Sequence, residues 1–231
     1  MSSSHEASYK RVYVWELPVR FFHWINAASI MILTATGLVI GQPFTLMAGM
    51  DASSQYWFGW VRFIHFLSAY ILVINLAVRI YWAFKGNEYA KWHNFIPMKK
   101  EQRDEIKEVI KVDVFQTTVH GKISVGHNAL AYTVYLGLFV MILIQIITGF
   151  GLYSKMSDAW FPAIFGWIVP LLGGDYSTKM VHHILTWFFI IFTIVHVYLT
   201  FYHDYVEGRG TISSIVGGWK FEKAEDLKKH H

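Results

Sequence analysis

The chain has 231 residues, of which 54% are hydrophobic and 18% aromatic, a composition too apolar for an ordinary soluble domain. It contains no cysteine, which excludes disulfides, thiolate metal sites, iron–sulfur clusters and covalent haem attachment within this chain. The formal charge is +4, but the basic residues flank apolar segments and form no stripe with interleaved aromatics, so the pattern excludes a nucleic-acid partner.

Four apolar segments are long enough to span a bilayer and predict an all-α transmembrane four-helix bundle. They cover about residues 19–40, 60–84, 123–153 and 179–202, within a membrane domain of residues 19–204. The first is longer than the apolar region of a signal peptide and lacks a small-residue cleavage site, so we expect it to be retained. The third is longer than a bilayer requires, which predicts a tilted or protruding helix.

The basic residues predict how the spans are oriented. Seventeen of the 20 Lys and Arg residues lie in residues 10–20, 79–122 and 209–229. Because basic residues accumulate on the cytoplasmic side, we expect both termini (residues 1–18 and 205–231) and the loop 85–122 to be cytoplasmic. The loop 154–178 is then on the outer side. Its apolar stretch 160–173 is short and contains two prolines, which favours an interfacial or re-entrant segment.

The fourth span carries four histidines in an otherwise apolar stretch: His182, His183, His196 and His203. Ionisable residues inside membrane helices are costly and usually functional. On a helix, His182 and His196 lie within about 40° of one another and about 21 Å apart along the axis. A bilayer core is about 30 Å thick, so this helix offers one ligand near each face. His183 points about 140° away from His196.

Two further histidines lie at matching depths. His65 comes early in the second span, which enters from outside, and so pairs with His182 on the outer side. His23 comes early in the first span and pairs with His196 on the cytoplasmic side. Two bis-histidine sites in a four-helix bundle suit two b-type haems. The alternative, histidines hydrogen-bonded between helices, does not predict this agreement in spacing, face and leaflet.

Other residues have two open interpretations each. His183 replaces His182 as a ligand if the start of the helix is distorted. Arg62 and Arg79 flank the second span and either contact haem propionates or extend to the membrane surface. His127 and Asn128 either bind a quinone headgroup or anchor the third span. His203 either contacts a propionate or quinone or lies at the cytoplasmic interface.

Several motifs together resemble a known family. They are residues 13–24 (YVWELPVRFFHW), residues 126–128 (GHN), the histidines His182, His183 and His196, and residues 213–219 (SSIVGGW). In combination they resemble the b-type cytochrome subunit of membrane-bound uptake nickel–iron hydrogenases. That family belongs to a wider set with the gamma subunit of formate dehydrogenase and bacterial cytochrome b561. The resemblance covers nearly all of the four-helix region.

The resemblance implies a membrane electron carrier with two non-covalent b haems in the bacterial inner membrane. Electrons would come from a periplasmic hydrogenase with a nickel–iron large subunit and an iron–sulfur small subunit. They would leave to menaquinone or ubiquinone near the cytoplasmic face. The resemblance supports the two histidine pairs as axial ligands and places His127 and Asn128 near the quinone. Hydrogen activation would reside in the other subunits, because this chain has no cysteine.

Two other functions fit parts of the pattern. The same dihaem arrangement would serve another electron donor, such as a formate dehydrogenase. A histidine-lined transporter is the alternative from a different class. Transporters usually show inverted repeats or helices broken at the midplane, whereas these spans look continuous and carry histidines toward the two faces.

Overall fold

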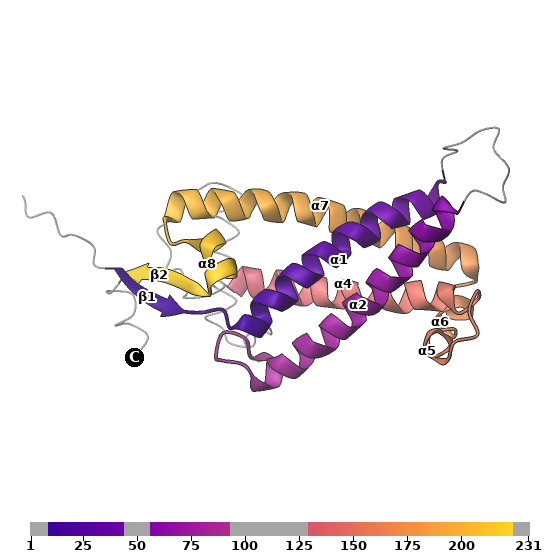
Figure 1. Ribbon diagram of the computed structural model, residues 1–231, viewed down its shortest axis with the longest axis horizontal. Coiled ribbons are helices and arrows are strands. Elements are labelled where there is room, and N and C mark those ends of the chain that lie inside the picture. The colour runs from indigo at the N-terminus through magenta and orange to yellow at the C-terminus, as the bar shows by residue number, and fades with distance from the viewer. Residues whose placement is uncertain (1–8, 44–55, 93–128, 224–231) are drawn as a thin grey trace, which may run out of the picture. The chain divides into compact units, whose positions relative to one another are not determined.

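The structure, a computed structural model, describes residues 9–43, 56–92 and 129–223. These residues form, in chain order, β1 (Tyr9–Tyr13), α1 (Leu17–Gly41), α2 (Trp57–Lys85), α4 (Ala129–Tyr153), α5 (Trp160–Ala163), α6 (Ile168–Leu171), α7 (Asp175–Glu207), α8 (Thr211–Gly217) and β2 (Trp219–Lys223) (Figure 1). The chain divides into two compact units, which we describe separately. The helix unit comprises Phe22–Arg79 and Phe139–Ile194, and the terminal unit comprises the remaining segments.

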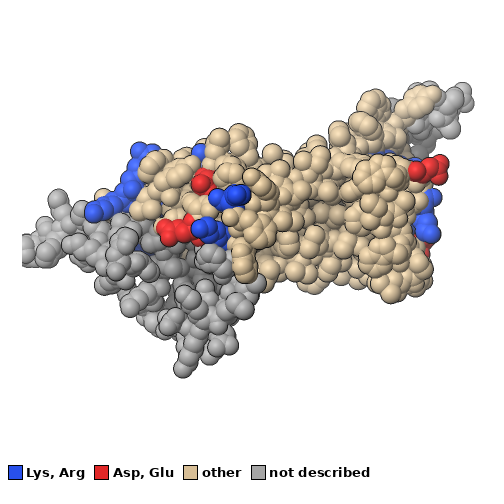
Figure 2. All heavy atoms as spheres, turned by 90° about the horizontal axis from the view of Figure 1, so that it is seen from below, with Lys and Arg blue, Asp and Glu red and all other residues tan. Residues whose placement is uncertain are grey.

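As predicted, four described helices are long and apolar enough to cross a membrane, so the chain is a multi-pass membrane protein: Leu17–Gly41, Trp57–Lys85, Thr133–Tyr153 and Asp175–Val206. The predicted start of the third span, residues 123–128, lies outside the described residues. Figure 2 shows a broad surface on which no described Lys, Arg, Asp or Glu is visible. Many large apolar side chains of these helices are exposed, as lipid-facing residues should be.

Proline and glycine mark where the described helices begin and end. Pro18 lies in the first turn of α1, where a missing backbone N–H costs nothing, and Pro43 follows shortly after its end. After α7 and α8 the chain turns through glycines with positive φ, namely Gly208 (62°), Gly210 (70°) and Gly218 (89°).

An aromatic cluster joins the short helices α5 and α6 to the helix unit. Phe150 of α4 is buried, and its ring centroid lies 5.1 Å from those of Tyr70 and Phe161 and 5.7 Å from that of Phe165. The stretch 160–173 therefore folds back as two short helices, each four residues long, and forms no additional span. On its other side it exposes apolar residues, including Trp160 and Trp167.

The terminal unit brings the two ends of the described chain together in a small antiparallel sheet. Strands β1 and β2 pair from Tyr9↔Lys223 to Tyr13↔Trp219. The ring centroids of Tyr13 and Trp219 lie 5.0 Å apart, and the Arg11 guanidinium lies 4.3 Å from the Trp219 centroid. The sequence analysis predicted no strand in either segment.

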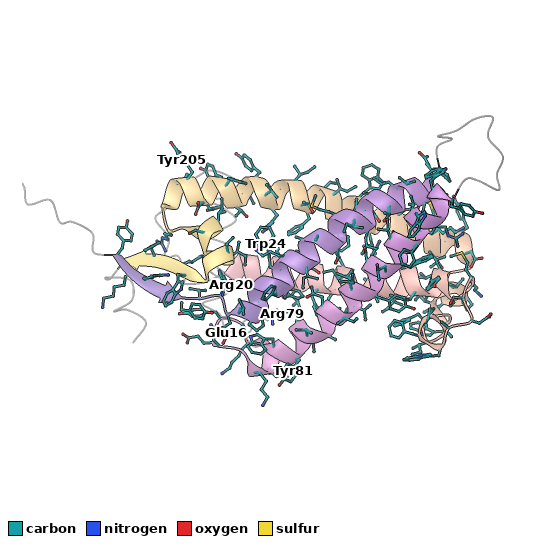
Figure 3. The ribbon with its side chains drawn as sticks, viewed as in Figure 1. Glu16, Arg20, Trp24, Arg79, Tyr81 and Tyr205 are labelled. Carbon is teal, nitrogen blue, oxygen red and sulfur yellow. The ribbon has the colours of Figure 1, made fainter. Side chains whose placement is uncertain are left out.

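Glu16 connects the start of α1 to the end of α2 within the same unit (Figure 3). Its Oε2 accepts hydrogen bonds from Trp82 Nε1 (2.9 Å) and from the backbone N–H of Asn87 (2.8 Å). Asn87 Nδ2 in turn donates to the Val14 carbonyl (3.0 Å). Trp15 Nε1 donates to Ser214 Oγ (3.2 Å), so helix α8 joins the same network.

We expect Glu16→Ala to loosen this unit while leaving the helix unit intact. The change leaves the Trp82 and Asn87 donors without their charged acceptor, a cost of about 2 kcal/mol or more. Hydrogen exchange followed by mass spectrometry should show faster amide exchange in residues 82–92 and in β1. Asp158→Ala, which removes an exposed carboxylate elsewhere, is the control. Unchanged exchange in the Glu16 variant would contradict the assigned network.

Candidate functional site

His65 projects from α2 onto α1, where Thr36 binds its ring. Thr36 Oγ1 lies 2.9 Å from His65 Nδ1. The same hydroxyl donates its single proton to the Ile32 carbonyl (2.6 Å), with the Leu33 carbonyl at 3.3 Å. The Thr36 oxygen must therefore accept the hydrogen bond from His65, which places a proton on Nδ1. Nε2 is then the unprotonated nitrogen, the form that coordinates a metal.

His182 of α7 has the same arrangement on α4. Thr148 Oγ1 lies 2.9 Å from His182 Nδ1 and donates to the Ile144 carbonyl (2.8 Å). By the same reasoning Nδ1 of His182 carries the proton and Nε2 is free to act as a ligand. A described pair of spans thus supplies each histidine together with its threonine: α2 with α1, and α7 with α4.

A glycine next to each threonine makes room for the imidazole. A Cβ atom placed on Gly37 would lie 3.3 Å from Cε1 of His65, and one on Gly149 would lie 3.0 Å from Cε1 of His182. Both distances are shorter than ordinary van der Waals contact, so a side chain at either position would press on the ring. Each histidine is therefore held at two points by a Thr-Gly dipeptide of the neighbouring helix.

Each of the two histidines offers the nitrogen donor that a haem iron takes as an axial ligand. Among the described residues there is no group of three or more His, Asp or Glu side chains that would hold a bare metal ion. A haem iron needs only two axial ligands from the protein, because the porphyrin supplies the other four nitrogens. Two imidazoles with free Nε2 atoms therefore suit a haem better than an isolated metal ion.

His183 points to a different helix from its neighbour. A Cβ atom on Gly41 of α1 would lie 2.6 Å from Cε1 of His183, so this ring packs against the end of α1. The divergence from His182 is what a regular helix requires, since consecutive residues differ by 100°. Helix α7 runs from Asp175 to Glu207 through both histidines, and the choice between His182 and His183 as the ligand stays a prediction.

Gln145 fixes the backbone of α7 at His182. Its Nε2 donates to the His182 carbonyl (3.2 Å) and to Thr186 Oγ1 (3.2 Å), while Thr186 donates to the same carbonyl (3.0 Å). Its Oε1 is buried without a hydrogen-bond partner among the described residues. Gln145 precedes Thr148 by one helical turn, so α4 contacts both the backbone and the ring of His182.

The two arginines of α2 occupy different surroundings. Arg62, one turn before His65, donates from Nη2 to Met156 Sδ (3.2 Å), and its Cζ lies 6.0 Å from the Phe66 ring centroid. Arg79 is buried, with its Cζ 5.8 Å from the Phe22 centroid (Figure 3). One turn earlier on α2, Asn75 Nδ2 donates to the Phe22 carbonyl (3.0 Å).

The remaining predicted site residues are His23, His196, His203, His127 and Asn128. His23 belongs to the helix unit and His196 to the terminal unit, so their pairing stays a prediction from sequence spacing. His203 is half-buried on α7, and its ring centroid lies 5.6 Å from that of Tyr202. His127 and Asn128 lie outside the described residues.

The sequence analysis did not assign roles to Thr36 and Thr148. A signal was present, because the dipeptide Thr-Gly occurs at residues 36–37 and again at 148–149, each time inside a predicted span. Threonine in a membrane helix usually bonds the carbonyl four residues earlier. Only the structure reveals that the hydroxyl of each of these two residues also lies within hydrogen-bond distance (2.9 Å) of a histidine Nδ1.

These features define a class of protein: a multi-pass membrane protein whose apolar helices carry histidines held through Nδ1 by a threonine of a neighbouring helix. A family model described as prokaryotic cytochrome b561 matches residues 14–218. The chain belongs to that family. The predicted resemblance to hydrogenase b-type cytochrome subunits is also confirmed by the curated relatives.

Three of these relatives illustrate the similarity. Each is named "Probable Ni/Fe-hydrogenase B-type cytochrome subunit", with a numeral 1 after "hydrogenase" in the third. The protein from Azotobacter vinelandii is 37% identical, over 92% of this chain and 89% of its own length. The protein from Cupriavidus necator is 35% identical, over 92% and 88%. That from Escherichia coli K12 is 32% identical, over 91% of each.

Proposed function

We propose that this chain is the membrane subunit that carries electrons from a nickel–iron hydrogenase to quinone. The names of its relatives support the hydrogenase as partner. The observation that carries the proposal is the pair of membrane histidines, His65 and His182, whose Nδ1 atoms are engaged by threonines and whose Nε2 atoms are left for a metal. The absence of cysteine leaves hydrogen activation to the partner subunits.

His65 and His182 would hold the outer haem b of the pair. When bound, haem b supplies a one-electron redox centre that needs no open coordination position when both axial ligands are histidines. The protein supplies the two imidazoles, the glycines that leave space for them and the apolar surroundings. Phe66, whose ring stacks on Tyr153 at 4.1 Å, adds to these surroundings one residue after His65.

His23 and His196 would hold a second, inner haem. The support is the spacing along α7, where His196 follows His182 by 14 residues on nearly the same face, about 21 Å toward the cytoplasmic end. His23 lies near the start of α1, at the same end of the membrane under the proposed topology. In that topology both termini are cytoplasmic and the membrane is the bacterial inner membrane.

Arg62 and Arg79 would bind haem propionates. The described contacts of the Arg62 guanidinium are a thioether and an aromatic ring, which leave most of its five donors available for a carboxylate. Arg79 is buried in a membrane-spanning helix beside the Phe22 ring, and a propionate would add an anionic partner for its charge. The two residues lie toward opposite ends of α2, as the two propionate-bearing sites would.

Menaquinone or ubiquinone would bind near the cytoplasmic face, close to His127, Asn128 and His203, and would be reduced there. A histidine and an amide would supply hydrogen bonds and a proton carrier to the headgroup. An electron that moves from the outer side to the cytoplasmic side moves against the membrane potential. This stores about 2.3 kcal/mol per 100 mV if the whole field is crossed. The quinone would take up its protons from the cytoplasm.

Two alternatives are less well supported. A formate dehydrogenase-like donor would use the same haem ligands, but the relatives are named for hydrogenase. A histidine-lined transporter would need a path or a multi-ligand ion site. The described residues offer paired histidines and no larger ligand cluster. The described parts of the four spans are also continuous helices, without the midplane breaks that transporters show.

The complex purified through a tag on this chain tests the function. We expect it to contain the hydrogenase subunits and two b haems per chain by the pyridine haemochrome assay. Hydrogen should reduce these haems only when the hydrogenase subunits are present, and quinone should reoxidise them. A chain that purifies from hydrogenase-producing cells without haem would refute the function. Haem reduced by formate and not by hydrogen would point to the other donor.

A further inference from the structure

We propose that Thr36 and Thr148 are positioning residues that set the reduction potential of the outer haem by accepting hydrogen bonds from its two axial histidines. The inference rests on the proposed function, because it concerns the histidines assigned there as ligands. It adds a role for two residues that do not themselves touch the iron.

The direction of the two hydrogen bonds follows from counting protons. Each threonine hydroxyl has one proton and a short contact to a backbone carbonyl four residues earlier, 2.6 Å for Thr36 and 2.8 Å for Thr148. A carbonyl oxygen cannot donate, so the hydroxyl proton lies in that bond and the histidine must donate through Nδ1–H. The opposite direction would place the imidazole proton on Nε2 and prevent coordination.

A hydrogen bond from Nδ1–H makes an imidazole a stronger electron donor. Partners of this kind raise the basicity of a ligating histidine and fix its orientation. A more basic ligand stabilises ferric iron more than ferrous iron, so both threonines should lower the reduction potential. Thr36 and Thr148 act on different histidines and share no hydrogen-bond partner, so their effects should add.

The same residues also define the plane of each ring. Nδ1 is fixed by the threonine, and Cε1 packs over Gly37 in one case and Gly149 in the other. Two fixed points on one edge of a ring leave it little freedom to rotate about its Cβ–Cγ bond. The electron paramagnetic resonance (EPR) spectrum of a ferric bis-histidine haem depends on the angle between its imidazole planes, so it reports whether this positioning is lost.

Valine and serine variants separate the hydroxyl from the shape of the side chain. Valine keeps the volume of threonine and removes the acceptor, whereas serine keeps the acceptor and loses a methyl group. Thr193→Val is the matched control, because Thr193 also donates to the carbonyl four residues earlier (Phe189, 2.8 Å) but has no described histidine contact. Redox titration of the two b haems and EPR of the ferric complex are the measurements.

We expect Thr36→Val and Thr148→Val each to raise the potential of one haem and shift its EPR signal, and the double variant to raise it by the sum. Serine at either position should restore both properties, and Thr193→Val should change neither. The inference is overturned if both valine variants leave potential and spectrum unchanged, or if serine behaves as valine does. Should valine abolish haem binding, retention by serine supports the inference and loss by serine overturns it. Wild-type complex without haem would refute the proposed function instead.

Discussion

Replacing His182 by alanine is expected to remove one of the two b haems and to reduce hydrogen-dependent quinone reduction to the background of a strain lacking this chain. The iron would retain a single protein ligand, His65, and the ring that fills the space over Gly149 would be gone. His65→Ala, which removes the other proposed axial ligand of this haem, should have the same effect. The haem assigned to His23 and His196 should remain in both variants.

His183→Ala is the matched control, since it removes the adjacent imidazole on the same helix. That ring packs against Gly41, whereas His182 packs against Gly149, so we expect both haems and most of the activity to persist. Haem content and the split α-band of the reduced cytochrome measure the result. Two haems in the His182 variant together with one in the His183 variant would reverse the ligand assignment.

The membrane spans were predictable because their signal is local. An uninterrupted apolar run of more than 18 residues has few folded alternatives, since lipid cannot satisfy an exposed backbone. Pro18 and Pro43 lie close to the two ends of α1. The histidine spacing was informative for a related reason: a membrane helix is regular, so sequence separation converts directly into angle and depth.

The sheet of the terminal unit was not predictable in this way. Its strands have five residues each, and Tyr13 pairs with Trp219, more than 200 positions away in the chain. No turn connects the strands directly, so the hairpin signals that identify short strands are absent. Glu16 looked like an ordinary polar residue before a span, and its two bonds to the end of α2 depend entirely on tertiary structure.

The sequence indicated candidate ligands but not the side chains that support them. His65 and His182 are conspicuous because they are ionisable groups within apolar helices. Thr36 and Thr148 are unremarkable by that test, because a hydroxyl bonded to its own helix costs little in lipid. Their role depends on which helix faces which, and spacing within one helix carries no information about its neighbours.

Valine at Gly149 is expected to displace the His182 ring and with it the outer haem. A Cβ atom there already lies 3.0 Å from Cε1, and the two methyl groups of valine need more space. Gly37→Val should act in the same way on His65, from a starting distance of 3.3 Å. Alanine at either position requires a movement of a few tenths of an ångström, so we expect haem to be retained with an altered EPR spectrum.

Gly41→Val tests whether His182 or His183 is the ligand without substituting either histidine. Its Cβ atom would lie 2.6 Å from Cε1 of His183, a closer approach than at Gly149, so Gly41→Val should disturb His183 more strongly than Gly149→Val disturbs His182. If His182 is the ligand, Gly41→Val keeps the haem although its clash is larger, and Gly149→Val loses the haem although its clash is smaller. Gly137→Val, at a position where a Cβ atom meets nothing within 4 Å, controls for valine in a membrane helix. Loss of haem at Gly149 with retention at Gly41 cannot come from general instability of the bundle, because instability would follow the size of the clash. Loss at Gly41 with retention at Gly149 would contradict the assignment of the iron to His182.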